Sequence, residues 1–313
     1  MKIAVCNTKQ NEWSRDLCAA ASVGIAACGD SAVLVNNESA IDVLTVADAA
    51  IVTCDAFPNR SDGGFSFRNA IAAICKFRGI PRLVIETGFM HNIRSLQRQE
   101  TTTARLYWAA GWDGIKRNAD YCVPEHVDSS RWKLLELPAV PPVWTKKGPV
   151  LVFGQVEGGV AEIGVDVNTE YARVAQACRK NLPGVRMVFR PHPQVLQRDL
   201  PRVYEQPLSA MGYEVDPFHS VRLLLSQARV AVTWMSNASV DAVLSGVPVI
   251  CLSESNVAWD VAEHDIANVA DPIIPPKERR QSFLERLAWC QWSIEEFGNG
   301  IAWSQLRRKI TCR

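Results

Sequence analysis

Three small polar residues lie between an apolar run and a helical pattern in this 313-residue chain. They are among the residues best suited to chemistry. They are Ser236, Asn237 and Ser239, which follow the run at 230–235 and precede a helix expected to end at Gly246. Serine and asparagine at such a position cap a helix by accepting a backbone N–H. The free N–H groups and the dipole of a helix N-terminus also attract anions such as phosphate. The stretch therefore predicts a helix cap and leaves open whether an anion also binds there.

A second polar pair, Arg190 and His192, belongs to the Arg-Pro-His-Pro run at 190–193. Proline fixes the backbone φ angle and removes an N–H donor, so this loop should be stiff. A stiff loop with arginine and histidine after a strand suits the binding of a diphosphate or a sugar hydroxyl. Arg190 could instead pair with a surface carboxylate, but the bracketing prolines favour binding. Gln155 follows Gly154 after another apolar run, where a tight turn would let a ligand approach the backbone.

Two carboxylates in the first half of the chain could remove a proton from a hydroxyl group. Asp62 precedes two glycines, and Glu86 ends an apolar run. Transfer of a group to a hydroxyl needs a base that accepts the hydroxyl proton, and either residue could serve. The alternative for Asp62 is an exposed Asp-Gly turn. The alternative for Glu86 is an ion pair with Arg82 or Arg94, so both carboxylates remain candidates.

Short apolar runs alternate with helical patterns, which is typical of a parallel sheet with helices on both faces. Residues 137–149 interrupt the alternation with four prolines and therefore predict a linker. We expect two doubly wound domains, at 1–143 and 144–313. Most of the polar candidates then follow strands, where open α/β sheets bind ligands. Strands are expected at 3–6, 32–35, 50–54, 82–86, 150–153, 185–189 and 230–235, and helices at 14–28, 65–77, 170–180, 218–228 and 280–297.

Composition and spacing exclude several classes of protein. The net charge is +1, which argues against a protein that binds nucleic acid or membranes through its overall charge. The ten cysteines are dispersed without a Cys-x-x-Cys pair, which indicates buried thiols in a reducing cytoplasm and neither disulfides nor a zinc site. We expect no secretion signal and no membrane span. Neither the dinucleotide-binding Gly-x-Gly-x-x-Gly pattern nor a P-loop occurs.

Positive charge is concentrated in one part of the chain. Residues 60–117 contain ten Lys or Arg and four Asp or Glu, so this segment carries a net charge of +6. Tyr107, Trp108 and Trp112 lie within it. Basic and aromatic side chains together suit a nucleic-acid backbone and a base taken out of its stack. They suit an acidic polysaccharide equally well, so both partners remain open.

The candidate segments of the second domain resemble the nucleotide-sugar half of GT-B glycosyltransferases. The resemblance rests on VLVFGQ at 150–155, VFRPHP at 188–193 and SNASVDAVLSGVPVICLSES at 236–255. It implies GT-B architecture, in which two Rossmann-like domains face a cleft and a final helix, at about 280–310, packs back toward the first domain. It also implies a nucleoside diphosphate sugar as donor, with a UDP-sugar expected, and no strict need for a metal. The donor-binding residues would be Gln155, Arg190, His192, Ser236, Asn237, Ser239 and Asp241, the last in place of a glutamate that the family often has.

Two segments of the first domain look similar to capsule-type and phage GT-B enzymes. These are Glu-x-Gly-Phe at 86–89 and an aromatic-Gly-Asp-Gly stretch within 107–122. This similarity favours Glu86 over Asp62 as the base. It also implies, as the main interpretation, a phage-type enzyme in the host cytoplasm that transfers a sugar to a 5-hydroxymethylpyrimidine base in DNA. The acceptor-binding residues would then be Arg94, Tyr107, Trp108, Asp113, Lys116 and Arg117.

Three other functions fit the same residues. The acceptor could be a capsular or other surface polysaccharide. A nucleotide-sugar 2-epimerase shares the architecture and would release an isomerised sugar nucleotide without any acceptor. A protein without catalytic activity could bind a nucleotide or DNA, although the two candidate carboxylates count against it.

Overall fold

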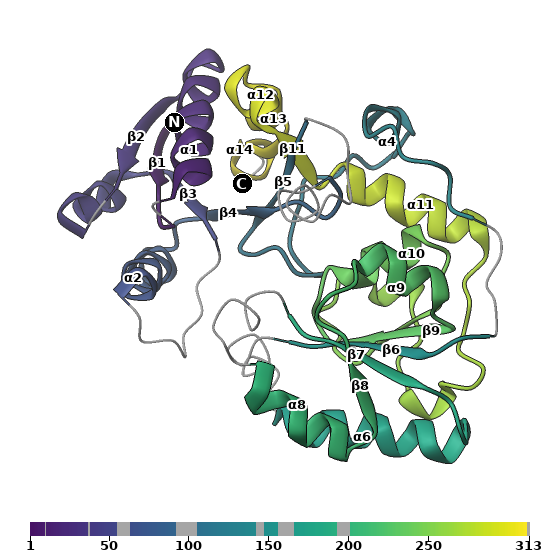
Figure 1. Ribbon diagram of the computed structural model, residues 1–313. Coiled ribbons are helices and arrows are strands. Elements are labelled where there is room, and N and C mark those ends of the chain that lie inside the picture. Colours follow the sequence, from purple (N-terminus) through teal and green to yellow (C-terminus); the bar gives the residue numbers. More distant parts are fainter. Residues whose placement is uncertain are drawn as a thin grey trace. The chain divides into compact units, whose positions relative to one another are not determined.

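The computed structural model describes residues 1–9, 11–36, 38–54, 63–91, 105–141, 147–155, 166–192 and 201–311. Asp62 and Arg94 lie outside these ranges. The chain divides into two units, each built around its own sheet (Figure 1). Unit 1 comprises Met1–Leu135 and Glu285–Arg313, and unit 2 comprises Glu136–Leu284.

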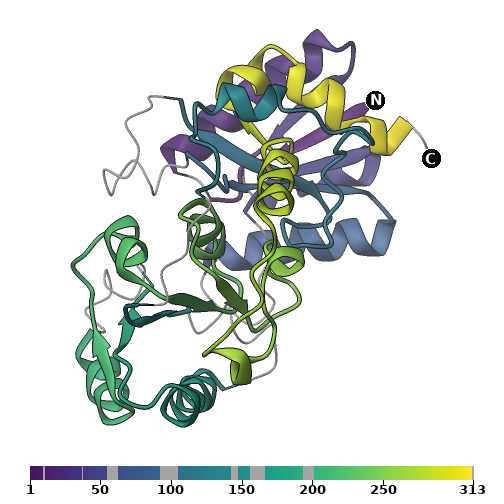
Figure 2. The ribbon, with the colours of Figure 1, turned by 90° about the vertical axis from the view of Figure 1, so that its right-hand side faces the viewer.

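Unit 1 contains a mixed six-stranded sheet in the order β11-β5-β4-β3-β1-β2. The strands are β1 (Lys2–Cys6), β2 (Ser31–Val35), β3 (Ala49–Thr53), β4 (Arg82–Thr87), β5 (Tyr107–Trp112) and β11 (Gln291–Ser293). The first four are parallel, whereas β5 runs antiparallel to both β4 and β11. Helices cover both faces of this sheet (Figure 2). They are α1 (Glu12–Ala27), η1 (Glu38–Val46), α2 (Gly63–Arg78), α4 (Ser130–Leu134), α12 (Ile294–Gly298), α13 (Ile301–Leu306) and α14 (Arg308–Thr311).

The central strand β1 contributes to two hydrophobic cores, because successive side chains of a strand point to opposite faces. Ile3 and Val5 pack in the core that includes α1 and the C-terminal helices. Ala4 and Cys6 pack in the core that includes α2. All four side chains are completely buried. A short, wholly apolar strand is what the parallel interior of such a sheet requires.

The C-terminal segment adds a strand to unit 1, and the prediction of one helix over 280–297 is wrong. Helix α11 (Lys277–Ala288) ends early, and β11 pairs with β5 before α12 begins. Ser293 starts α12 with a capping box: its hydroxyl accepts the Glu296 N–H, and the Glu296 carboxylate accepts the Ser293 N–H. The spacing of the aromatic residues in this segment therefore reflects the packing of a strand and short helices. These residues do not form the apolar stripe of one amphipathic helix.

Gly24 lets the C-terminal segment approach α1 closely. A Cβ atom at position 24 would lie 1.8 Å from the carbonyl oxygen of Phe297, so no larger residue fits there. The same segment is anchored by Trp303 Nε1 and Arg307 Nη1, which donate to Asp30 Oδ2 at 2.8 Å and 3.2 Å. These contacts join residues more than 270 positions apart. The last helices thus belong to unit 1 through tertiary packing.

Unit 2 contains a parallel five-stranded sheet in the order β10-β9-β6-β7-β8. This doubly wound order reverses direction between β6 and β9, and ligands bind near the carboxyl ends of strands at such a reversal. The strands are β6 (Val150–Phe153), β7 (Met187–Arg190), β8 (Tyr213–Val215), β9 (Val230–Thr233) and β10 (Val249–Cys251). The helices are α6 (Val167–Asn181), α8 (Pro201–Ala210), α9 (Val221–Gln227), α10 (Ala238–Leu244), η3 (Trp259–Val261) and η4 (Ile266–Asn268), and α11 begins in this unit.

The predicted α/β fold class is confirmed, since each unit has a helix-covered sheet, parallel throughout in unit 2 and parallel from β4 to β2 in unit 1. The strand expected at 150–153 is found with the same ends, as β6. The strand expected at 185–189 is Met187–Arg190, and the helix expected at 218–228 is Val221–Gln227. The sequence pattern predicted the middle of each of these elements correctly, and only the end residues differ from the prediction.

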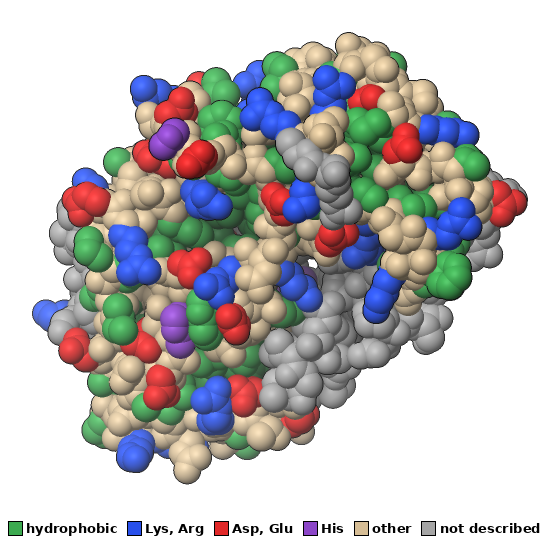
Figure 3. Space-filling view, turned by 180° about the vertical axis from the view of Figure 1, so that it is seen from behind, with side chains coloured by type: hydrophobic (Ala, Val, Ile, Leu, Met, Phe, Trp, Pro, Cys, Tyr) green, Lys and Arg blue, Asp and Glu red, His purple; other side chains and the backbone are tan. Residues whose placement is uncertain are grey.

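Charge is evenly mixed over much of the surface. On the face shown in Figure 3, basic and acidic side chains of the described residues are interspersed. The nine cysteines that the structure describes are all free thiols, and most are buried. Within the described part of the chain, none of the helices has the length and apolar character needed to cross a membrane.

Candidate functional site

Unit 2 brings its candidate residues to one edge of its sheet, which we call the unit 2 edge. Because its five strands are parallel, their carboxyl ends all lie along this edge. Arg190 is the last residue of β7, and the loops after β6, β7 and β9 lie at the same edge. The residues placed at this edge or in the first turns of α10 beside it are Gln155, Arg190, His192, Ser236, Asn237, Ser239 and Asp241.

Arg190 is almost fully buried, at 8% exposure. Its register places it opposite Phe153 of β6, and the Gly154 N–H donates to its carbonyl oxygen at 2.9 Å. Its guanidinium Nη1 donates to the Asp216 carbonyl oxygen, 3.3 Å away, in the loop after β8. Arginine keeps its positive charge throughout the physiological pH range. The fold therefore fixes a cation at the unit 2 edge, where an anionic group can bind.

The turn after β6 is tightened by packing. A Cβ atom on Gly154 would lie 2.8 Å from Phe189 Cζ, so the glycine is required by this aromatic neighbour. The sequence suggested a different reason, the approach of a ligand to the backbone. The Gln155 N–H donates to the Tyr171 hydroxyl at 2.9 Å, which fixes the backbone of this half-buried glutamine.

The loop from Ser236 to Ser239 connects β9 to α10. The Ser236 hydroxyl, one position before the N-cap, accepts the Ala238 N–H at 3.2 Å in a local turn. Asn237 occupies the N-cap position without a side-chain capping bond. Ser239 is fully buried, and its hydroxyl lies 3.0 Å from the Ser236 carbonyl oxygen and 2.9 Å from Asn256 Oδ1. Ser239 therefore stabilises the loop, and Ser236 and Asn237 are its half-buried members.

Asn256 organises the same loop, although the sequence did not single it out. Its side chain is 1% exposed. Its Nδ2 donates to the Trp234 carbonyl oxygen at 2.9 Å, and its Oδ1 accepts the Ala258 N–H at 2.8 Å. Its partners Ser239 and Trp234 are 17 and 22 positions away in the sequence, so no local pattern marks it. A buried amide with this many partners fixes the backbone around it.

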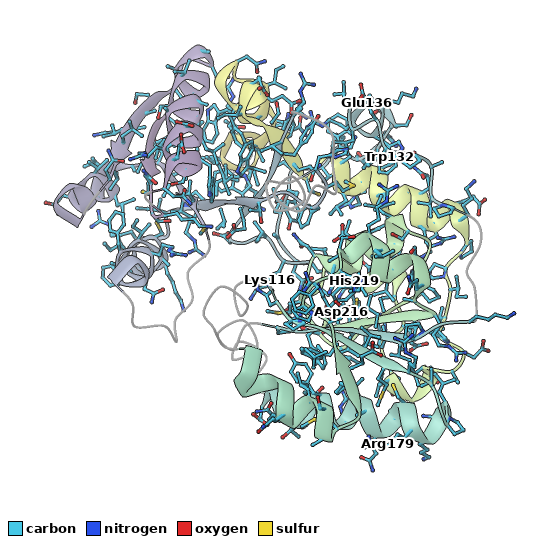
Figure 4. All side chains as sticks on the ribbon, in the orientation of Figure 1. Lys116, Trp132, Glu136, Arg179, Asp216 and His219 are labelled. Atoms are coloured by element: carbon cyan, nitrogen blue, oxygen red, sulfur yellow. The ribbon has the colours of Figure 1, made fainter. Side chains whose placement is uncertain are left out.

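A hydrogen-bonded pair that the sequence analysis missed, Asp216 and His219, lies after the end of β8 (Figure 4). The Asp216 carbonyl oxygen accepts the bond from Arg190. Asp216 Oδ2 is 2.7 Å from His219 Nδ1, and Asp216 Oδ1 accepts the Phe218 and His219 N–H groups at 3.0 Å each. Burial alone would raise the pKa of Asp216, but these hydrogen bonds outweigh it and lower the pKa. The local signal was the Asp-Pro pair, which favours a turn.

Asp241 lies in the first turn of α10 and is half-buried. A carboxylate there interacts favourably with the helix dipole, which gives this residue a structural role whether or not it binds a hydroxyl. His192 follows β7 and is also half-buried. Both residues keep the donor-binding roles that the resemblance implied as predictions.

In unit 1, Glu86 lies near the carboxyl end of β4 and is half-buried. Its Oε1 accepts the N–H of Thr87 at 3.1 Å. Cys54 directly follows the neighbouring strand β3, donates its N–H to the Ile85 carbonyl oxygen at 2.8 Å and has a φ of 74°. Burial, with the negative charge of Glu86 nearby, raises the pKa of the Cys54 thiol, which stays protonated. Glu86 is thus a half-buried carboxylate at a strand end, and its role as a base stays a prediction.

The aromatic residues expected to bind an acceptor belong to the core of unit 1. Tyr107, Trp108 and Trp112 in β5 are 3%, 5% and 2% exposed. The Tyr107 hydroxyl donates to the Leu134 carbonyl oxygen at 3.4 Å, and burial raises the Tyr107 pKa. These rings are explained by packing, and none is exposed for stacking on a ligand.

The turn after β5 carries the remaining described acceptor candidates. Asp113 is exposed with a φ of 61°, and its N–H donates to the Arg82 carbonyl oxygen at 2.7 Å. These are the contacts of an Asp-Gly turn. Lys116 and Arg117 follow and are half-buried. Their acceptor roles stay predictions, as do the acceptor role of Arg94 and the role of Asp62 as a candidate base, both outside the described residues.

No family profile matches this chain, and no curated protein sequence matches it. Solved structures do. A beta Kdo 2,4 transferase, KpsC of Thermosulfurimonas dismutans, is 15% identical with a TM-score of 0.53, over 93% of this chain and 90% of that one. The beta Kdo 2,7 transferase of the same KpsC is 14% identical with a TM-score of 0.48, over 99% and 100%. The UDP-GlcNAc 2-epimerase of Neisseria meningitidis is 11% identical with a TM-score of 0.37, over the whole of both chains.

The likeness to the beta Kdo 2,4 transferase is a likeness of fold. At 15% identity it confirms the two-sheet α/β organisation expected from the GT-B resemblance. The activity must be argued from the residues themselves. In the parts of the chain that the structure describes, no group of three His, Cys, Asp or Glu side chains could hold a metal ion.

Proposed function

We propose that this chain is a glycosyltransferase that moves a sugar from a nucleotide sugar to a hydroxyl group of a saccharide. The observation that carries this proposal is the buried Arg190 at the unit 2 edge, between the turn after β6 and the Asp216 loop. The fold likeness to a beta Kdo 2,4 transferase, an enzyme that acts on a sugar, supports it.

On the donor side, Arg190 would bind the phosphate oxygens of the nucleotide. A fixed guanidinium stabilises the negative charge that develops on the leaving nucleotide when the bond to the sugar breaks. Gln155, His192, Ser236 and Asn237 would add hydrogen bonds along the same edge. Ser239 would act indirectly, by holding the loop against Asn256. Asp241 would bind a ribose or sugar hydroxyl, as the GT-B resemblance implies.

On the acceptor side, Glu86 would take the proton of the attacking hydroxyl. The hydroxyl oxygen then bonds to the anomeric carbon, the bond from that carbon to the phosphate oxygen breaks, and the nucleotide leaves with the electron pair. Asp62 is the second candidate for the base. Glu86 is preferred because it is placed at a parallel strand end with one carboxylate oxygen bound by Thr87 N–H.

A saccharide acceptor has better support than a hydroxymethylated DNA base. The DNA interpretation relied on aromatic side chains interleaved with basic ones, and the rings of Tyr107, Trp108 and Trp112 are buried. None of the compared structures named above is a DNA-modifying enzyme, and the one with the highest TM-score is named as a Kdo transferase. The basic side chains of residues 60–117 would serve an acidic saccharide without any need for stacking.

The test is a transfer assay with defined donors and acceptors. UDP-GlcNAc, UDP-glucose and CMP-Kdo are each incubated with the chain and a Kdo-terminated oligosaccharide, and products are measured by mass spectrometry. We expect the mass of one sugar to be added to the oligosaccharide. The matched reaction replaces the oligosaccharide with a duplex that contains 5-hydroxymethylcytosine, and there we expect no added mass.

Three outcomes would overturn the proposal. Glycosylated duplex would establish the DNA acceptor instead. An isomerised UDP-sugar that forms without any acceptor would establish a 2-epimerase. Calorimetric binding of a nucleotide with no turnover of any donor would indicate a binding protein without catalytic activity.

A further inference from the structure

The four-residue turn Gly88–His91 follows β4 directly and is held by hydrogen bonds from several sides. Gly88 N–H donates to the Tyr107 carbonyl oxygen at 3.0 Å, and Tyr107 N–H donates to the His91 carbonyl oxygen at 3.2 Å. His91 Nε2 lies 2.7 Å from the Leu135 carbonyl oxygen. The φ of His91 is 49°, in the left-handed region that favours glycine. A non-glycine residue stays in that region only where its surroundings fix it.

Two further N–H groups of the turn share one acceptor from the far end of the chain. Phe89 and Met90 donate to Gln291 Oε1 of β11, at 2.9 Å and 3.0 Å. Gln291 is completely buried. Gly88 leaves the space that this contact needs, since a Cβ atom there would lie 2.5 Å from the Tyr107 carbonyl oxygen and 3.1 Å from Gln291 Oε1. The turn therefore depends on β11 for its shape.

Gln291 and Glu86 lie in one row of the unit 1 sheet. Both are in register with Ala109 of β5, one on each side of it. Residues opposite one another in neighbouring strands lie on the same face of a sheet. Ala109 contributes only a methyl group to the space between them. The Gln291 side chain thus lies on the same face as the candidate base, two strands away.

The surroundings of the Gln291 amide nitrogen indicate which atom of this side chain has a structural role. Gln291 Nε2 is buried and has no hydrogen-bond partner. A buried donor without a partner is destabilising, so an apolar residue would pack at this position at lower cost if packing were its only role. The side chain is therefore explained by its Oε1 atom, which fixes the turn.

We propose that Gln291 is a positioning residue for glycosyl transfer, which acts through the Gly88–His91 turn to fix Glu86. The link is short, because Thr87 N–H binds the Glu86 carboxylate and Thr87 immediately precedes Gly88. A displaced turn would move this N–H group and with it the base. This inference rests on the proposed function, in which Glu86 accepts the proton of the acceptor hydroxyl.

Three variants separate positioning from simple stability. Gln291→Met removes Oε1 and keeps the length of the side chain. Gln291→Glu keeps an oxygen acceptor in place of Oε1 and replaces only the unpartnered Nε2 group with a second oxygen. Gln305→Met is the matched control in the same C-terminal segment, where the lost bond, from Gln305 Nε2 to the Cys122 carbonyl oxygen, is remote in sequence from the turn.

Hydrogen exchange rates of the turn amides test whether Gln291 holds the turn, and the measurement needs no substrate. We expect the amides of Phe89 and Met90 to exchange about tenfold faster or more in Gln291→Met, and at the wild-type rate in Gln291→Glu and Gln305→Met. Unchanged exchange in Gln291→Met would show that the carbonyl does not hold the turn and would overturn the inference.

Sugar transfer to the Kdo-terminated oligosaccharide, from whichever donor of the panel is active, tests whether Glu86 is positioned to act as the base. In Gln291→Met, at a temperature where the protein is folded, we expect kcat to fall about 10- to 100-fold with the donor KM unchanged. Gln291→Glu should recover most of this loss, and Gln305→Met should match the wild type. Wild-type kcat in Gln291→Met, with lowered thermal stability alone, would make Gln291 merely structural and refute the inference. Donor binding without transfer by the wild-type chain would refute the proposed function and this inference with it.

Discussion

At the scale of single residues, two arginines at opposite ends of β7 in unit 2 have opposite surroundings. Arg190 ends β7 and is 8% exposed. Arg186 precedes the same strand, is 63% exposed, and pairs with Glu214 at 2.8 Å. An exposed ion pair contributes little, because water and salt screen it. A buried guanidinium at a ligand edge has no such screening, so only Arg190 should matter for binding.

We therefore expect Arg190→Ala to weaken binding of the active nucleotide-sugar donor by about 10- to 150-fold, or about 1.5–3 kcal/mol. The reason is the loss of charge-assisted hydrogen bonds to phosphate oxygens. Isothermal titration calorimetry measures the change. Arg186→Ala is the control and should bind the donor as the wild type does. Equal Kd values for Arg190→Ala and the wild type would contradict the donor assignment.

The second prediction at this scale concerns pH and the Asp216–His219 pair. Hydrogen bonds from His219 and Phe218 lower the pKa of Asp216 in the folded state, despite burial. The ionised carboxylate therefore stabilises the fold above the ordinary aspartate pKa of about 3.9, and this contribution is lost as the pH falls below it. Asp216→Asn should be less stable than the wild type at neutral pH.

Urea unfolding at a series of pH values checks this expectation. The difference in free energy of unfolding between wild type and Asp216→Asn should shrink as the pH is lowered from about 5 to about 2, because the wild-type carboxyl becomes protonated there. Asp265→Asn provides a comparison at another loop aspartate of the same unit. A difference that stays constant over this range would show that the Asp216 charge does not stabilise unit 2.

At the scale of elements, the C-terminal segment shows how tertiary contacts override a local pattern. Its aromatic and aliphatic spacing predicted one helix over 280–297, whereas Gln291–Ser293 form a strand against β5. The capping box of Ser293 and Glu296 is a sequence signal for a helix that starts at this point. The pattern Ser-x-x-Glu inside the expected helix was available to indicate the break.

The packing of α12 on α1 leads to the third prediction. Gly24→Ala would normally stabilise a helix by about 1 kcal/mol. Here the new Cβ atom would lie 1.8 Å from the Phe297 carbonyl oxygen, so we expect a loss of about 2 kcal/mol or more in the free energy of unfolding. Gly298→Ala in α12 is the matched control, since its Cβ atom would lie 3.8 Å from Ala20 Cβ and should be tolerated. Thermal and urea unfolding measure both, and a stabilised Gly24→Ala would show that the segments are not packed this closely.

At the scale of the whole molecule, the charge balance bears on the acceptor. The chain carries a net charge of +1, while residues 60–117 carry a net charge of +6. Binding to a DNA backbone releases counterions, so affinity based on six to ten phosphate contacts falls about 10³- to 10⁵-fold between about 50 mM and 200 mM salt. An oligosaccharide with one or two carboxylates releases few counterions.

We therefore predict that the acceptor KM for a Kdo-terminated oligosaccharide rises less than about tenfold over the same salt range. Steady-state transfer rates at constant saturating donor measure it. The donor Kd at each salt concentration is the control, because in the proposed function Arg190 also binds a charged group. A far steeper rise in KM would favour a polyanionic acceptor such as DNA.

The sequence by itself determined the elements whose signals are local. The β6 strand was predicted from a run of apolar residues, and the start of α10 from the small polar residues before it. Each depends on neighbours within a few positions, where backbone sterics and side-chain periodicity act directly. Because parallel strands end at a common edge, these local readings were also enough to gather the donor candidates of unit 2.

Only the tertiary structure decided which side chains are buried and which distant residues support the site. Tyr107 and Trp108 looked available for binding and lie in the core, because β5 is enclosed between β4 and β11. Asn256 and Gln291 fix the Ser236 loop and the Gly88–His91 turn through hydrogen bonds that span 17 to 202 positions. Such partners are set by the pairing and packing of whole strands, and no window of neighbouring residues contains that information.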